Sequence, residues 1–71
     1  PRTDEAYNYL SLAFLSTRNY KEAVDALEKI KVQDVTIKTA YQKATFYRGL
    51  ELFQNMQFDD AITMFAKSLE N

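Results

Sequence analysis

The chain has 71 residues, no cysteine and no histidine, a formal net charge of -1, and a single glycine and a single proline. This length leaves room for one small domain, whose core supplies no more than about 3–5 kcal/mol on its own. We therefore expect support from neighbouring chain, a partner or self-association. The lack of cysteine excludes disulfides, a thiolate nucleophile and cysteine metal sites. The few glycines and prolines favour helices over a strand-rich fold.

Several functional classes are disfavoured by composition. Acidic and basic residues are interspersed, without the basic stripe that a phosphate backbone requires, so we expect no nucleic-acid partner. The apolar runs are too short for membrane insertion. No glycine-rich phosphate loop or serine–base constellation is visible, so we expect no enzyme activity, catalytic residue, cofactor or metal site. The chain begins at Pro1 and not at a methionine, and we interpret it as a piece of a longer protein.

The first half of the chain predicts two helices joined by a short polar break. The first helix is expected over Asp4–Ser16, with Thr3 as its N-cap and acidic residues in its first turn, where the helix dipole favours them. The second lies within Asn19–Lys31, capped by Asn19, with an apolar face opposite a charged one. On the charged face, Asp25 and Lys29 are spaced to form an ion pair.

The second half predicts another pair of helices. The third helix is expected over Val35–Asn55, with Asp34 as its N-cap, and the fourth over Phe58–Glu70. Within the third, Arg48 is expected to pack its stem and pair with Glu51. The residues of the fourth helix expected to face inward are Phe58, Ala61, Ile62, Phe65 and Leu69.

The two halves repeat one another with a shift of 38 positions, so that Tyr20 matches Phe58, Ala23 matches Ala61 and Leu27 matches Phe65. The same shift aligns the first and third helices, including the pairs Ala6/Ala44, Tyr9/Tyr47, Ser11/Gly49, Leu12/Leu50 and Leu15/Phe53. A small residue at the Ser11/Gly49 position of both units predicts close approach of the helices within each hairpin. The sequence thus predicts an all-α fold of two antiparallel helix-turn-helix hairpins within one domain, residues 1–71, with units at about 4–31 and 35–70.

These residues resemble the tetratricopeptide repeat, whose pattern spaces an aromatic, a Leu-Gly pair, an aromatic, an alanine and a phenylalanine along two helices. The first unit offers Tyr7, Leu10-Ser11, Phe14, Ala23 and Leu27, and the second offers Thr45, Arg48-Gly49, Leu52, Ala61 and Phe65. The period of 38 exceeds the family's 34, which places about one extra helical turn between Lys31 and Ala44. The resemblance implies a short solenoid. Its second and fourth helices would be the outer ones, with Tyr20 and Leu27 anchoring the second helix on the first.

The resemblance also implies a concave groove lined by the first helix of each unit. By position, the groove would comprise Glu5, Asn8, Leu12, Leu15 and Ser16, followed by Lys43, Phe46, Leu50, Phe53 and Gln54. Asn8 and Lys43 are the only polar residues suited to gripping a peptide carboxylate, so we expect an apolar groove centred on Phe46, Leu50 and Phe53. The candidate partner-binding residues are Asn8, Leu12, Leu15, Lys43, Phe46, Leu50 and Phe53. These apolar residues could equally pack against a neighbouring repeat or another copy of the chain.

Two functions follow as expectations. The first is a non-catalytic protein-interaction module, part of a longer repeat scaffold, that binds a peptide or protein segment through its apolar, aromatic face. The alternative is a structural spacer or self-associating repeat unit without a peptide ligand of its own, because two repeats fall below the roughly three that usually form a stable array.

Overall fold

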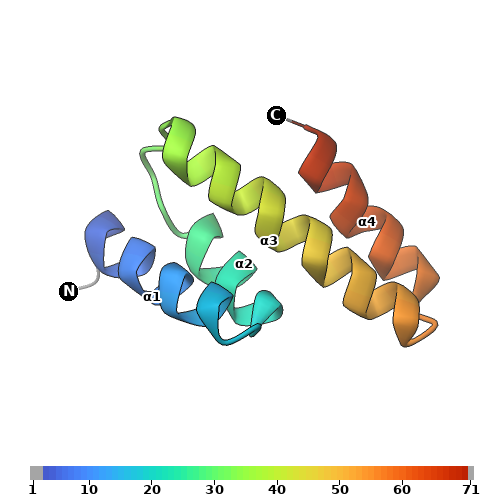
Figure 1. The fold of residues 1–71 in the computed structure, drawn as a ribbon. Helices are drawn as coiled ribbons and strands as arrows, with labels where there is room; N and C mark the ends of the chain where they lie inside the picture. The colour runs from blue at the N-terminus through green and yellow to red at the C-terminus, as the bar shows by residue number, and fades with distance from the viewer. Residues whose placement is uncertain (1–2, 71) are drawn as a thin grey trace.

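A computed structural model describes residues 3–70 of the chain, so Pro1, Arg2 and Asn71 of the expected 1–71 domain lie outside the described residues. The described part is all-helical, with α1 over Asp4–Ser16, α2 over Tyr20–Glu28, α3 over Val35–Gln54 and α4 over Phe58–Leu69. The helices pack in chain order, α1 against α2, α2 against α3 and α3 against α4 (Figure 1). The predicted all-α class is confirmed, and the predicted helix bounds hold to within a few residues.

Two of the three predicted N-caps are present. The Thr3 hydroxyl accepts a hydrogen bond from the Ala6 amide (3.3 Å), and the Asp34 carboxylate accepts one from the Ile37 amide (2.9 Å). Asn19 precedes α2 but makes no side-chain cap; its amide nitrogen donates to the Thr17 hydroxyl (2.7 Å). The predicted capping bond from Asn19 was therefore wrong.

The turn after α1 ends that helix with a left-handed residue, Arg18, at φ 62°. The Arg18 amide donates to the Leu15 carbonyl (3.2 Å), and the Asn19 amide donates to the Phe14 carbonyl (2.8 Å). This pair of bonds is the Schellman motif, which satisfies carbonyls at a helix end that would otherwise lack partners.

The turn after α3 repeats this geometry 38 residues later. Met56 lies at φ 63°. Its amide donates to the Phe53 carbonyl (3.0 Å), and the Gln57 amide donates to the Leu52 carbonyl (2.8 Å). The sequence repeat is thus accompanied by a repeat of backbone geometry at the turn of each hairpin.

Replacing both left-handed residues with glycine is expected to stabilise the fold. In the left-handed region a residue with a Cβ is destabilised by about 1–2 kcal/mol, and glycine avoids this cost. Part of the advantage is offset, because glycine also has more conformational freedom in the unfolded chain. We expect Arg18→Gly and Met56→Gly each to raise the free energy of unfolding by about 0.5–1 kcal/mol. Urea denaturation followed by circular dichroism measures this change, and glycine at exposed Lys38 of α3 serves as the destabilising control. A loss of stability in both turn variants would contradict the Schellman assignment.

The hydrophobic core centres on α2. The buried cluster combines four residues of the α2 segment with two of α3: Ala23, Val24, Leu27, Ile30, Ile37 and Ala44. Tyr7, Phe14 and Leu15 of α1 are partly buried against the same cluster. Since α1 packs on one side of α2 and α3 on the other, α2 is the central helix of the first three in its contacts.

Of the two residues expected to anchor α2 on α1, Leu27 is completely buried in the cluster against which α1 packs, and Tyr20 is partly buried. The Tyr20 ring stacks on that of Tyr47 in α3, with centroids 5.1 Å apart and an interplanar angle of 17°. Such an offset stack contributes about 0.5–1.5 kcal/mol beyond the area that it buries. Tyr20 therefore joins the two hairpins to each other.

Close approach at the Ser11/Gly49 position is confirmed for both residues. Ser11 is completely buried, and its hydroxyl donates to the Asn8 carbonyl (2.8 Å). A Cβ added at Gly49 would lie 2.6 Å from Cε1 of Phe65 in α4. No side chain fits at Gly49 without movement of that ring.

The inward face of α4 differs from the prediction. Ala61 is buried and Phe65 is half-buried, as expected, but Phe58, Ile62 and Leu69 are exposed. The helix instead buries the small Ser68 against α3, because close packing of two helices favours small side chains at their contact.

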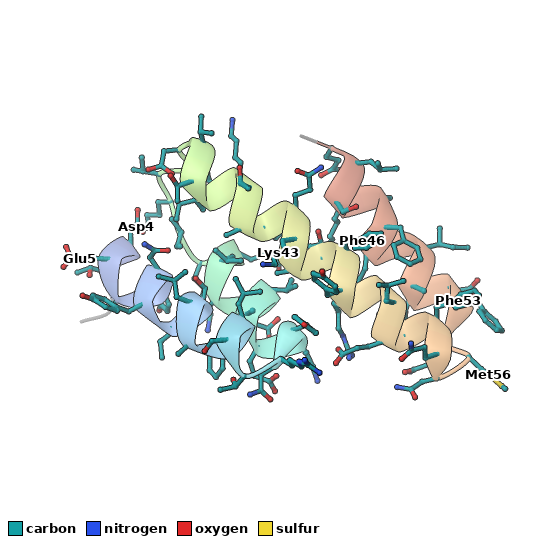
Figure 2. All side chains as sticks on the ribbon, viewed as in Figure 1. Asp4, Glu5, Lys43, Phe46, Phe53 and Met56 are labelled. Atoms are coloured by element: carbon teal, nitrogen blue, oxygen red, sulfur yellow. The ribbon has the colours of Figure 1, made fainter. Side chains whose placement is uncertain are left out.

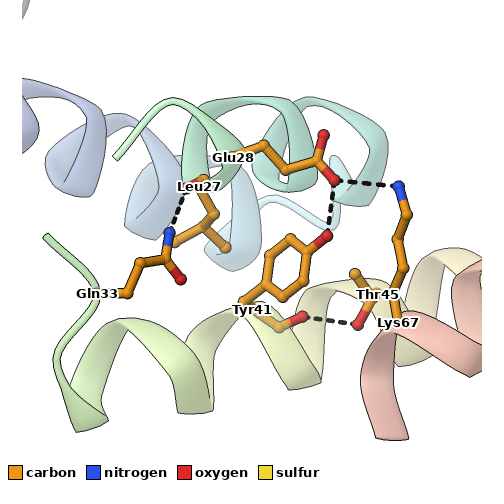
Figure 3. A network of polar contacts seen from close by, with 6 residues as sticks. All are labelled: Leu27, Glu28, Gln33, Tyr41, Thr45 and Lys67. Atoms are coloured by element: carbon orange, nitrogen blue, oxygen red, sulfur yellow. Dashed lines mark hydrogen bonds and ion pairs between the residues drawn. The ribbon is translucent and has the colours of Figure 1, made fainter. Parts of the chain in front are cut away.

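A polar network ties α2, α3 and α4 together (Figure 3). Oε2 of Glu28 accepts hydrogen bonds from the Tyr41 hydroxyl (2.6 Å) and from the Lys67 ammonium (3.2 Å). Burial, and then the bond to Glu28, raise the pKa of Tyr41 well above its ordinary value. The Gln33 amide donates to the carbonyls of Leu27 and Ile30 after α2 ends. These contacts fix the angle at which α3 leaves the first hairpin.

Candidate interaction surface

The second hairpin, formed by α3 and α4, carries an exposed apolar strip. It consists of Phe46, Leu50 and Phe53 from α3 and Phe58, Ile62, Phe65 and Leu69 from α4; all are exposed except Leu50 and Phe65, which are partly buried. Their spacings of three and four residues place each set on one side of its helix. Figure 2 shows Phe46 and Phe53 along α3 on the side of α4. We call these seven side chains the apolar strip.

Aromatic contacts across the hairpin join the two halves of the strip. The rings of Phe53 and Phe58 meet edge to face with centroids 5.3 Å apart, and those of Phe46 and Phe65 lie 5.8 Å apart. Despite these contacts, Phe46 is 45% exposed, Phe53 56% and Ile62 64%. The strip is therefore ordered by its own contacts while much of its apolar surface faces solvent.

The structure brings together only part of the predicted groove. Phe46, Leu50 and Phe53 lie in the strip, and Lys43 is exposed beside Phe46 on α3, where both residues line a shallow depression. Leu15 of α1 lies near Lys43, since both line a hollow at the Tyr20–Tyr47 stack.

The α1 part of the groove lies apart from the strip. Asn8 and Leu12 sit on α1, which packs against α2 at the far side of the molecule from α4 (Figure 1). Leu12 is exposed, and the Asn8 carbonyl accepts the Ser11 hydroxyl. The remaining positions of the implied groove, Glu5, Ser16 and Gln54, are also exposed.

The α4 half of the strip was missed in the sequence, where Phe58, Ile62 and Leu69 were expected to face inward. The 38-residue repeat nonetheless indicates that these residues lack a covering helix. The matching α2 residues Tyr20 and Val24 are covered by α3, and no helix within residues 3–70 follows α4 to cover Phe58 and Ile62.

A second hollow, of about 230 Å³, lies between α2 and the second hairpin. Both signs of charge line it, from Lys21 and Asp25 on α2 and Arg48 and Asp60 on the second hairpin.

Of the two predicted ion pairs, one is formed: Arg48 pairs with Glu51 (3.3 Å). The predicted Asp25–Lys29 pair is not formed, and the Lys29 ammonium lies over the Tyr7 ring, 5.7 Å from its centroid. The mixed charges balance one another and do not define an ion-binding site.

Asp4 holds the loop after α2 against the start of α1. Its two carboxylate oxygens accept hydrogen bonds from the Lys31 and Val32 amides, each 3.0 Å long. These two backbone bonds lower the pKa of the Asp4 carboxyl below its ordinary value of 3.8. Sequence reasoning assigned Asp4 only to the helix dipole, because nothing in the local pattern indicates a contact with residues so distant in the chain.

The Asp4 contact predicts a specific loss of stability in acid. Because the folded-state pKa is the lower one, the contact stabilises the protein above the unfolded-state pKa and is lost as the pH falls through the folded-state value. An NMR titration of the Asp4 carboxyl should therefore give a midpoint below 3.8. The Lys31 and Val32 amides should shift with the same midpoint, and Asp4→Asn should remove this shift. A midpoint at or above the ordinary value would contradict the contact.

None of the helices within residues 3–70 has the length and apolarity to cross a membrane, and the acidic side chains in this range form no group of three or more that could hold a metal ion. Comparison of the chain with protein-family models, with curated proteins and with solved structures returned no match.

Proposed function

We propose that the chain is a non-catalytic protein-interaction module of tetratricopeptide-repeat type, which binds a peptide or protein segment through the apolar strip. The observation that carries this proposal is the exposure of the strip. Phe53 and Ile62 expose more than half of their surface although a core of this size needs every apolar residue it can bury. An ordered, exposed aromatic surface is typical of an interaction site.

Two features support the tetratricopeptide-type arrangement. The Schellman turns recur with a shift of 38 residues, and the fully buried Ser11 and the crowded Gly49 occupy equivalent places in the two hairpins. The longer period is accounted for by α3, whose first turns, around Ile37 and Tyr41, extend over α2 before the repeated part begins.

The strip suits a partner segment that presents an apolar face of its own. A half-exposed phenylalanine, leucine or isoleucine contributes about 1 kcal/mol when a partner covers it, so three or four anchors supply several kcal/mol. Side chains at three- and four-residue spacings on both helices match a partner helix with anchors at the same spacing. Lys43 beside Phe46 adds a place for an acidic residue at the rim.

Selection from a displayed library of amphipathic helical peptides tests this function. We expect selected peptides to bind the wild type, as measured by fluorescence anisotropy, and to lose at least about tenfold in affinity against Phe46→Glu/Phe53→Glu, because a buried unpaired charge replaces each anchor.

The matched control is Val32→Glu/Val35→Glu, which adds the same two charges at exposed apolar residues outside the strip. It should bind as the wild type does. Equal weakening in both double variants would show that charge, and not the strip, governs binding. Failure to select any peptide would count against the module itself.

A further inference from the structure

The contact between the two hairpins, where α3 packs on α2, indicates what kind of helix can cover the α4 side of the apolar strip. We call this contact the joint. At this joint α3 packs on α2, with Tyr47 stacked on Tyr20 and with Ala44 completely buried against the cluster that contains Val24 and Leu27. The α2 side of the joint is therefore an aromatic ring followed by two aliphatic residues. The α3 side is an alanine followed, three residues later, by a tyrosine.

The α2 side of this joint, which we call the receiving half, recurs on α4, where no helix covers it within residues 3–70. A shift of 38 residues takes Tyr20 to Phe58 and Val24 to Ile62, which keeps an aromatic at the first place and a β-branched residue at the second. Val24 is 3% exposed because α3 covers it, whereas Ile62 is 64% exposed. The difference in exposure thus arises from the missing neighbour and not from the residue type.

The α3 side of the joint, which we call the inserting half, recurs on α1 and is also exposed there. The same shift takes Ala44 to Ala6 and Tyr47 to Tyr9. Tyr9 is 73% exposed, and Ala6 is only partly buried where Ala44 is completely buried. Both halves of one interface are therefore present without a partner at opposite ends of the same molecule.

We propose that the partner of the α4 side of the strip is a second copy of this chain, whose α1 packs on α4 as α3 packs on α2. Tyr9 of one copy stacks on Phe58 of the next, and Ala6 lies over Ile62. This inference rests on the proposed function and names the partner at the same surface. The interface is heterologous, so association runs head to tail and does not close as a symmetric dimer.

The joint between copies is shorter than the joint within the chain. The 38-residue shift takes Tyr41 to Thr3, so the second copy makes no bond like that of Tyr41 to Glu28. A small interface of this kind gives weak association that depends on concentration. The wild type should therefore show an average mass that rises steadily with concentration.

Sedimentation equilibrium on two complementary variants tests the proposal. Tyr9→Glu removes the inserting half and Ile62→Glu removes the receiving half, and each residue is largely exposed, so helicity should be retained. Each variant alone should remain a monomer where the wild type associates. An equimolar mixture should form a 1:1 heterodimer and nothing larger, because Tyr9 of the Ile62→Glu copy still meets the α4 face of the Tyr9→Glu copy.

Other outcomes overturn the proposal in distinguishable ways. Dimers of Tyr9→Glu alone, with no heterodimer in the mixture, would show a symmetric contact between two strips. A wild type that stays monomeric up to about 1 mM, where binding is worth only about 4 kcal/mol, would rule out the second copy. If selected peptides still bound that monomer through the strip, the interaction module would stand without this partner. Tyr9→Gln and Ile62→Gln replace the charged variants if circular dichroism shows a loss of helix.

Discussion

Leu27→Ala is expected to lower the free energy of unfolding by about 3 kcal/mol, the largest loss from any single truncation in this chain. Leu27 is completely buried at the centre of the cluster that α2 forms with α1 and α3. Its truncation removes the transfer free energy of three carbons and leaves a cavity that helices on two sides of α2 prevent from closing. For a domain of this size the loss takes most of the stability.

Urea denaturation followed by circular dichroism measures the effect, with Leu69→Ala as the matched control. Leu69 is 81% exposed, so the same truncation should change the free energy of unfolding by less than about 0.5 kcal/mol. Similar losses in the two variants would contradict the placement of the core on α2 and restore Leu69 to the interior.

Gly49→Ala is expected to destabilise the protein by up to about 2 kcal/mol, although alanine is the better helix former. A Cβ at this position lies 2.6 Å from Cε1 and 2.7 Å from Cδ1 of Phe65, whose ring also contacts that of Phe46. Overpacking of this kind costs about 1–3 kcal/mol, against a gain of about 1 kcal/mol from helix propensity. The net loss therefore measures the closeness of α3 and α4.

Measuring Gly49→Ala in the Phe65→Leu variant as well shows whether the loss of stability comes from the contact of the added Cβ with the Phe65 ring. Phe65→Leu removes Cε1 and Cζ, two of the three ring atoms within 3.1 Å of the added Cβ. In that background Gly49→Ala should cost less, or become favourable through helix propensity alone. An equal cost in both backgrounds would show that the ring of Phe65 is not what requires glycine.

The helices and their bounds could be predicted because the signals are local. Thr3 and Asp34 are good cap residues at the start of apolar periodic segments, and the repeat places the second hairpin by analogy with the first. The pair Ser11/Gly49 likewise indicated close approach, since a small residue at the same place in two units has a packing cause.

The way in which the helices combine could not be predicted as well. Helices pack on two sides of α2 while its charged residues stay exposed, so its position between α1 and α3 depends on the angle at which α3 returns. That angle depends on contacts such as Tyr41 with Glu28. Asp4 accepts hydrogen bonds from the backbone amides of Lys31 and Val32, which lie far from it in the sequence. Because nearly every residue type has a backbone amide, the residue types at 31 and 32 give no indication of this contact.

The candidate surface was predicted in its α3 half only. Helical periodicity identifies Phe58, Ile62 and Leu69 as one apolar face but does not say whether a neighbour covers it. Tyr20 and Val24 have the same pattern and are covered, because α3 follows them in the chain. Exposure at the second hairpin is thus a property of the arrangement and not of the residues.

The central claim is that the strip is an interaction surface and not part of the core, and equilibrium unfolding of Phe46→Glu/Phe53→Glu tests it most directly. Measured at a concentration where wild type and variant are both monomeric, the free energy of unfolding should agree within about 1 kcal/mol, because both side chains are about half exposed already. A variant that unfolds, or that loses more than about 3 kcal/mol, would assign these phenylalanines to the core and contradict the proposed function.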